Sequence, residues 1–148
     1  MKQIALLVVC AVILGGCAIM VPGHLYPVQG PLSTQSTPPS YEVTLSGVMN
    51  SGSIEINPSK EVSCKGDWAA VAQDDPSARQ LADEWDTVYG SGFFVANVLG
   101  RAAFGRSVLT CQGGEKMAVE FLMLEPGNWK TAKGVARDAV GNVYKLTF

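Results

Sequence analysis

The chain has 148 residues, of which 47% are apolar and 16% are charged, and its formal net charge is −2. This length is typical of one domain, and 11 Lys and Arg spread over the whole chain are too few for a large basic patch, so we expect no nucleic-acid partner. A single His also argues against a His-rich metal site and against most His-dependent catalytic dyads.

The N-terminus has the pattern of a secretory signal peptide. A basic start at Lys2 is followed by an uninterrupted apolar run over 4–14 and then by small residues. The run is too short for a membrane-spanning helix, which needs roughly 20 residues. We therefore predict that residues 1–16 are cleaved after export.

The four residues that end this segment, Leu14-Gly15-Gly16-Cys17, resemble the bacterial lipobox. The resemblance implies that Cys17 becomes the N-terminus and carries acyl chains such as palmitate, which attach the protein to a membrane. Ala18, where Asp would mark retention in the inner membrane, resembles an outer-membrane address. The alternative is an ordinary signal peptide cut nearby, with Cys17 a free or paired thiol.

Residues 17–40 have the composition of a linker. Five prolines and no Asp, Glu, Lys or Arg follow Cys17, and proline lacks the N–H that regular ladders need. We predict a Pro-rich tether with a reach of roughly 25–30 Å. As an alternative, residues 25–28 could dock on the domain or on a partner as an extended strand.

A single domain is expected over 41–148. It begins with strands, because apolar and polar residues alternate over 41–45 and again over 53–56, with a turn around Gly52 between them. A second turn follows at 57–59, and Cys64 leads into a further extended segment.

The periodicity then changes to that of a helix over 76–90. Apolar residues recur at helical spacing, acidic residues and Pro76 suit its start, and Gly90 ends it. Asp83, Glu84 and Asp86 are expected on the solvated face, since neighbouring carboxylates on a helix diverge.

An apolar stretch at 93–99 follows the helix. It predicts a short buried helix or a core strand. The alternative is a loop that dips into a membrane surface, with Phe93, Phe94 and Phe104 as its contact residues.

The C-terminal third returns to strands. Residues 107–111 and 116–124 are separated by a Gly-rich turn, and 134–138 and 142–148 form a hairpin around Gly141.

Cysteine usage indicates one disulfide. Cys10 lies in the signal segment and Cys17 takes the lipid, which leaves Cys64 and Cys111 as an even pair in an oxidising compartment. A metal site is disfavoured because neither residue has a Cys or His at ligand spacing, and no C-x-x-C indicates a redox pair.

Several short motifs resemble a group of small, uncharacterised bacterial lipoproteins. They are Cys64-x-Gly66, Cys111-x-Gly113, the Gly-rich pattern within 134–144, and the segment 25–31. The resemblance covers most of the mature chain and implies no established activity.

We therefore expect a mainly β fold with a helical insertion, either a small barrel or a curved antiparallel sheet, with one disulfide. The expected function is that of a lipid-anchored envelope protein in the outer membrane, facing the periplasm. It would be a non-enzymatic structural or partner-binding module without cofactor or metal, whose partner is an envelope protein or a cell-wall component. The alternative is a cell-wall or glycan binder that uses exposed Trp68 and Trp129.

Asp138 and Asn142 are too few hard ligands for a cation site and are expected to form a turn.

Overall fold

The structure is a computed structural model that describes residues 19–48, 50–72, 75–101, 104–125 and 128–148. The predicted signal segment and Cys17 therefore lie outside the described residues.

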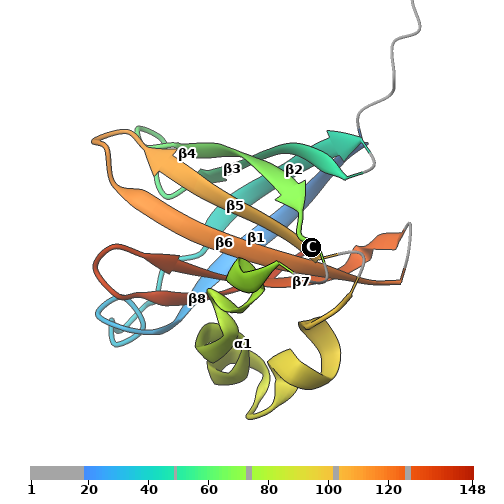
Figure 1. Cartoon of the computed structure of the whole chain (residues 1–148). Coiled ribbons are helices and arrows are strands. Elements are labelled where there is room, and N and C mark those ends of the chain that lie inside the picture. The colour runs from blue at the N-terminus through green and yellow to red at the C-terminus, as the bar shows by residue number, and fades with distance from the viewer. Residues whose placement is uncertain (1–18, 49, 73–74, 102–103, 126–127) are drawn as a thin grey trace, which may run out of the picture.

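Eight strands form a closed antiparallel barrel in which each strand pairs with the next along the chain and the last pairs with the first (Figure 1). The strands are β1 (Ile19–Gln29), β2 (Tyr41–Val48), β3 (Ser51–Asn57), β4 (Cys64–Ala70), β5 (Phe104–Cys111), β6 (Lys116–Glu125), β7 (Asn128–Asp138) and β8 (Val143–Thr147). The predicted mainly β fold with one disulfide is confirmed, and of its two forms the barrel is the observed one.

Every second side chain along each strand points inward, and these side chains fill the barrel interior. Val43 and Leu45 of β2 and Ile54 and Ile56 of β3 point inward and are buried, as the sequence pattern predicts. Small eight-stranded barrels leave just enough interior space for such side chains. The predicted hairpin at the C-terminus is also present, with Gly134 of β7 opposite Leu146 of β8.

The predicted linker is wrong over Ile19–Gln29, which forms strand β1. This strand pairs with β2 from Ile19 to Leu25 and with β8 from His24 to Gln29. Its prolines sit where a missing N–H is tolerated. Pro27 lies at a register shift against β8, and Pro22 lies in the part of β1 that no described residue of β8 reaches. The alternative that residues 25–28 dock as an extended strand is the one observed.

A helical insertion between β4 and β5 covers one outer face of the barrel (Figure 1). It contains the 3₁₀ turn η1 (Pro76–Arg79), helix α1 (Ala82–Tyr89) and the π-helical turn η2 (Phe94–Val98). The single helix predicted over 76–90 is thus two elements separated by Gln80 and Leu81. Gly90 ends α1 as expected, and the stretch 93–99 is mostly a short helical turn, one of the two expected forms, with Phe94 and Val98 buried and Val95 exposed.

Two apolar clusters result from this arrangement. The first fills the barrel, and the second lies between the insertion and the outer face of β5, β6 and β7. Strand β6 serves both, because Phe121 points into the barrel and Leu122 points to the insertion. A strand covered on both faces is expected to be almost continuously apolar, which explains why Glu120 alone interrupts the apolar run at 117–124.

Candidate functional site

The barrel has two ends with different chemistry. One end, here called the Ile19 end, carries the start of β1, the β2–β3 turn and the start of β7. The other, here called the Cys64 end, carries the β1–β2 connection, the β3–β4 and β5–β6 connections and the β7–β8 turn. In Figure 1 the Ile19 end lies to the right and the Cys64 end to the left.

A hollow of about 430 Å³ opens at the Cys64 end. Most of its walls are apolar, and we call it the Cys64-end cup. It is lined by residues of the strand ends and of the connecting loops, among them Leu32, Tyr41, Val62, Met117, Tyr144 and the disulfide. Cys64 and Cys111 lie opposite each other on β4 and β5, with their sulfur atoms 1.98 Å apart, so the predicted disulfide is confirmed and forms part of the cup.

A hydrogen-bonded turn fixes one wall of this cup. The carboxylate of Asp138 accepts hydrogen bonds from the backbone N–H groups of Val140 (3.1 Å) and Asn142 (2.9 Å), from the Asn142 side-chain amide (2.7 Å) and from the Tyr144 hydroxyl (2.7 Å). Asn142 is buried, and its Oδ1 accepts the N–H of Leu32 at 2.9 Å. The turn predicted for Asp138 and Asn142 is therefore present, and it fastens the loop after β1 to the last hairpin.

Gly30 permits this contact because a larger residue would collide with the turn. Its φ is +96°, and a Cβ at this position would lie 2.8 Å from the Cα of Asn142. The segment 25–31 and the pattern within 134–144, which the sequence presents as separate motifs, thus meet at one end of the barrel. Burial raises the pKa of Tyr144, and its hydrogen bond to Asp138 and the charge of Asp138 raise it further.

The Ile19 end has a different opening, which results from the short length of β8. This strand ends at Thr147, opposite His24 of β1 and Lys133 of β7. Residues 19–23 of β1 and 128–132 of β7 therefore extend beyond it with no described residue of β8 between them. The gap is a hollow of about 610 Å³ that we call the Ile19-end notch; it is lined by Ile19, Met20, Val21, Pro22, Asn128, Trp129, Lys130 and Phe148.

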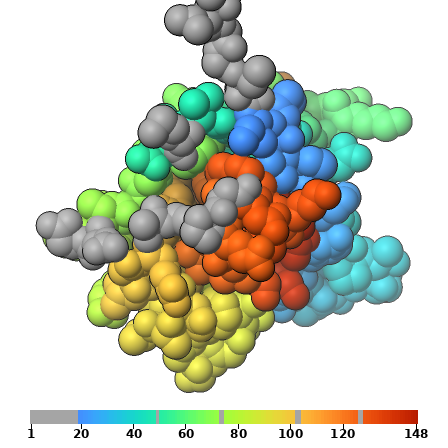
Figure 2. Space-filling view, turned by 90° about the vertical axis from the view of Figure 1, so that its right-hand side faces the viewer, coloured from blue at the N-terminus to red at the C-terminus, as the bar shows by residue number. Residues whose placement is uncertain are grey.

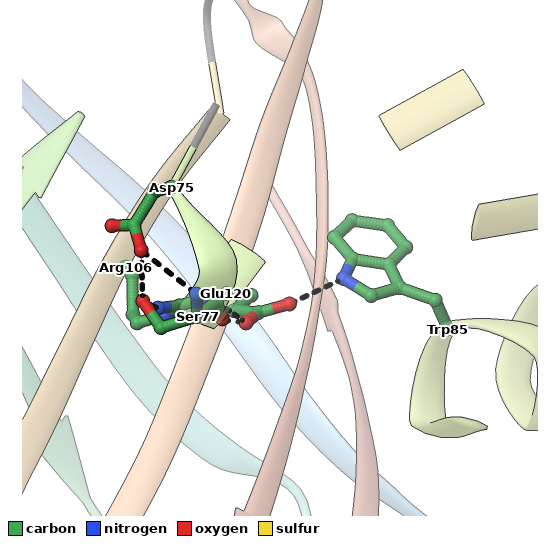
Figure 3. Close-up of polar contacts among 5 residues, drawn as sticks. All are labelled: Asp75, Ser77, Trp85, Arg106 and Glu120. Atoms are coloured by element: carbon green, nitrogen blue, oxygen red, sulfur yellow. Dashed lines mark hydrogen bonds and ion pairs between the residues drawn. The ribbon is translucent and has the colours of Figure 1, made fainter. Parts of the chain in front are cut away.

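Beneath the insertion, a buried carboxylate joins the barrel to the helices (Figure 3). Glu120 of β6 accepts a hydrogen bond from Trp85 Nε1 at 3.0 Å, and its other oxygen accepts from Arg106 Nε and Nη2 at 3.1 and 3.0 Å. Arg106 also donates to the hydroxyl and the carbonyl of Ser77, whose N–H and hydroxyl donate to Asp75. Burial raises the pKa of Glu120, whereas Trp85 and Arg106 act to lower it. The group is a structural clasp, because its hydrogen bonds are satisfied within the network.

None of the sequence-based predictions includes this clasp, although the sequence holds a signal for it. Glu120 is the one charged residue inside the apolar run 117–124, which marks a carboxylate that needs a buried partner. A related expectation is wrong. Glu84, predicted on a solvated face, is buried and pairs with Arg137 Nη1 of β7 at 2.6 Å. Asp86 is engaged too, since it accepts the N–H groups of Gly92 and Phe94.

The residues predicted as surface contacts are mostly interior. Phe94 and Phe104 are buried in the cluster under the insertion, and Phe93 is half-buried against it, so the core interpretation holds for the apolar stretch. Trp68 was expected to be partly exposed, but it is 4% exposed and its indole N–H donates to the carbonyl of Ser46. Trp129 is half-buried and packs edge-on against Trp68 with ring centroids 6.0 Å apart. The pair therefore does not present the two exposed rings that a glycan platform needs.

The described residues contain neither a cluster of metal ligands nor a membrane-spanning helix. No group of three His, Cys, Asp or Glu in this part of the chain is placed to hold a metal ion. Among the helices of the described ranges, none is long and apolar enough to cross a membrane.

The fold and the two ends define the class of this protein as a disulfide-linked, closed eight-stranded antiparallel barrel with a short helical insertion. No protein-family model matches the chain, and neither a curated protein nor a solved structure matches it significantly.

Proposed function

We propose that this protein is a lipid-anchored component of the bacterial cell envelope, held in the outer membrane through Cys17 and facing the periplasm, and that its barrel is a non-enzymatic binding module. The observation that carries the proposal is the position of the Cys64-end cup. The chain enters the barrel at Ile19, two positions after Cys17, and the cup opens at the opposite end. A barrel anchored at Cys17 would therefore present the cup away from the lipid surface.

The cup has the properties of a small-molecule or side-chain pocket. Its volume of about 430 Å³ lies within the usual range for such sites, and apolar walls combined with a few polar groups are typical of them. Of the charged residues that line it, exposed Glu115 and Lys116 carry opposite charges, and Asp138 is held in the turn described above. Asp138 has its acceptor sites filled, and among the described residues no buried side-chain nitrogen or oxygen lacks a partner. The cup therefore favours a neutral, apolar or aromatic group over a charged one.

Methyl NMR of the purified protein titrated with indole, a neutral aromatic probe, tests the binding role. The methyl signals of Met117 and Val62 should shift together and saturate, while that of Val108 on the outer face of β5 should not move. Val62→Trp should abolish the shifts by filling the cup, and Val108→Trp is the matched control. Shifts confined to other parts of the barrel would refute the cup as a binding site.

The anchor is tested separately. Cys17→Ser should leave the protein outside the membrane fraction, and mass spectrometry of the wild type should show acyl chains on an N-terminal Cys17 peptide. A wild-type protein without this mass would refute the lipid-anchored role. The alternative of a glycan binder receives no support from the positions of Trp68 and Trp129, since the first is buried and the second packs against it.

A further inference from the structure

The distance between the proposed anchor and the barrel is very short. Ala18 alone separates Cys17 from the first residue of β1. Two extended residues span about 7 Å at most, so an acylated Cys17 would hold the Ile19 end against the lipid headgroups. This replaces the long spacer expected from the prolines, because residues 19–29 of that segment form a strand of the barrel.

The Ile19 end carries apolar side chains that the fold leaves uncovered. Ile19 and Met20 of β1 are 52% and 70% exposed, Val48 at the end of β2 is 52% exposed, and Leu124 near the end of β6 is 44% exposed. Single exposed apolar residues are ordinary on a protein surface, but a group at one end beside an apolar hollow marks an interaction site. Figure 2 faces this end and shows the first residues of β1, in blue, close to those of β7, in orange.

The Ile19-end notch adds residues that suit a membrane interface. Trp129 and Phe148 line it, and both rings pack against the barrel core from this end. Lys130 lies at the same notch, and a lysine can place its stem along apolar surface while its ammonium group reaches the lipid phosphates. Tryptophan is likewise favoured where one side is apolar and the other wet.

We infer that the Ile19 end is a bilayer-contact surface, with Ile19, Met20 and Leu124 in the boundary between headgroups and acyl chains and the notch open to lipid. The inference rests on the proposed acylation of Cys17 and deepens it, because the barrel then sits on the membrane in one fixed orientation. The Cys64-end cup faces away from the lipid in that orientation.

Tryptophan quenching by brominated lipid tests this contact. The full chain, with acylation of Cys17 verified by mass, is reconstituted in phosphatidylethanolamine and phosphatidylglycerol vesicles whose acyl chains are brominated near the headgroup. We expect the vesicles to quench part of the emission, and Trp129→Phe to remove most of that quenched part. Met20→Ser should lower the quenched fraction by about half, because it weakens the contact between the Ile19 end and the bilayer. Val108→Ser, which likewise replaces an exposed apolar side chain with Ser but on β5, should leave it unchanged.

The outcomes separate the inference from the proposed function. The bilayer contact would be refuted, with the anchor left intact, if the acylated protein binds vesicles without quenching. The same holds if Met20→Ser and Val108→Ser behave alike. Absence of acyl mass on Cys17 would overturn the anchor and the bilayer contact together. Melting temperatures of the Met20 and Val108 variants close to that of the wild type establish that both are folded.

Discussion

Removing the positive charge beside Glu120 should destabilise the protein strongly. In Arg106→Met the Glu120 carboxylate, whose side chain is 1% exposed, keeps its bond from Trp85 but loses both bonds from Arg106. Removing one partner of a buried ion pair typically costs about 3–5 kcal/mol, because the other charge stays buried without compensation. The bonds from Arg106 to Ser77 are lost as well. We expect the free energy of unfolding to fall by about 4 kcal/mol at pH 7.

The size of this loss should depend on pH. Arg106 lowers the pKa of Glu120, so its removal lets burial raise that pKa further. A carboxyl group whose pKa is raised in the folded state favours folding at low pH, and this contribution is lost as the pH rises through the raised pKa. The difference between wild type and Arg106→Met should therefore be largest near neutral pH and shrink as the pH falls into the usual carboxyl range.

Urea unfolding followed by tryptophan fluorescence measures both effects, provided that the dependence of the unfolding free energy on urea concentration is the same in each variant. Lys65→Met is the matched control. It removes the cation of the exposed pair with Glu55, in which the side chains are 65% and 38% exposed, and should cost less than about 1 kcal/mol. A loss in Arg106→Met no larger than that of the control, or one that does not shrink in acid, would refute the clasp.

Three further predictions follow from other contacts. Proteolysis without reductant should yield one product joining the peptides of Cys64 and Cys111, and replacing both with Ala should lower the free energy of unfolding by about 4 kcal/mol, given a sequence separation of 47. Phe94→Ser should lower the melting temperature by about 10 °C or more because the ring is buried, whereas Val95→Ser, at a neighbouring exposed residue, should leave it nearly unchanged. Burial raises the pKa of Tyr89 to about 12, so its contribution to stability should be complete below pH 10 and be lost as the pH rises through 12; unfolding measured across this range should show a weaker alkaline loss in Tyr89→Phe.

Several strands and turns of the barrel can be predicted from the sequence because they depend on residues close together in the chain. Alternation of apolar and polar residues identifies the strands at 41–45 and 53–56, since one face of each is solvated. The disulfide follows from the count of cysteines left after the predicted processing. Gly141 marks the final hairpin, where its φ of +90° suits the turn.

The features that escaped prediction depend on contacts between distant segments. The prolines of 17–40 correctly disfavour a regular interior strand, but β1 places Pro22 beside the notch and Pro27 at a bulge, and neither location can be known before the length of β8 is known. Glu84 looks solvated from helical periodicity, yet Arg137, 53 positions away, makes its burial tolerable. The cup and the notch have the same origin, because each is assembled from strand ends that only closure of the barrel brings together.

Closure between β1 and β8 also constrains how the chain can fold. The first strand must wait for a partner more than 100 positions later, as Leu25 opposite Leu146 illustrates. Contacts of such long range slow folding, and until they form, β1 and β8 both present unpaired backbone edges that favour association between chains. The disulfide joins β4 to β5 in the middle of the chain, so it stabilises the pairing of these two strands but does not cover those edges. Any truncation that removes β8 should therefore yield an aggregating chain rather than a smaller barrel.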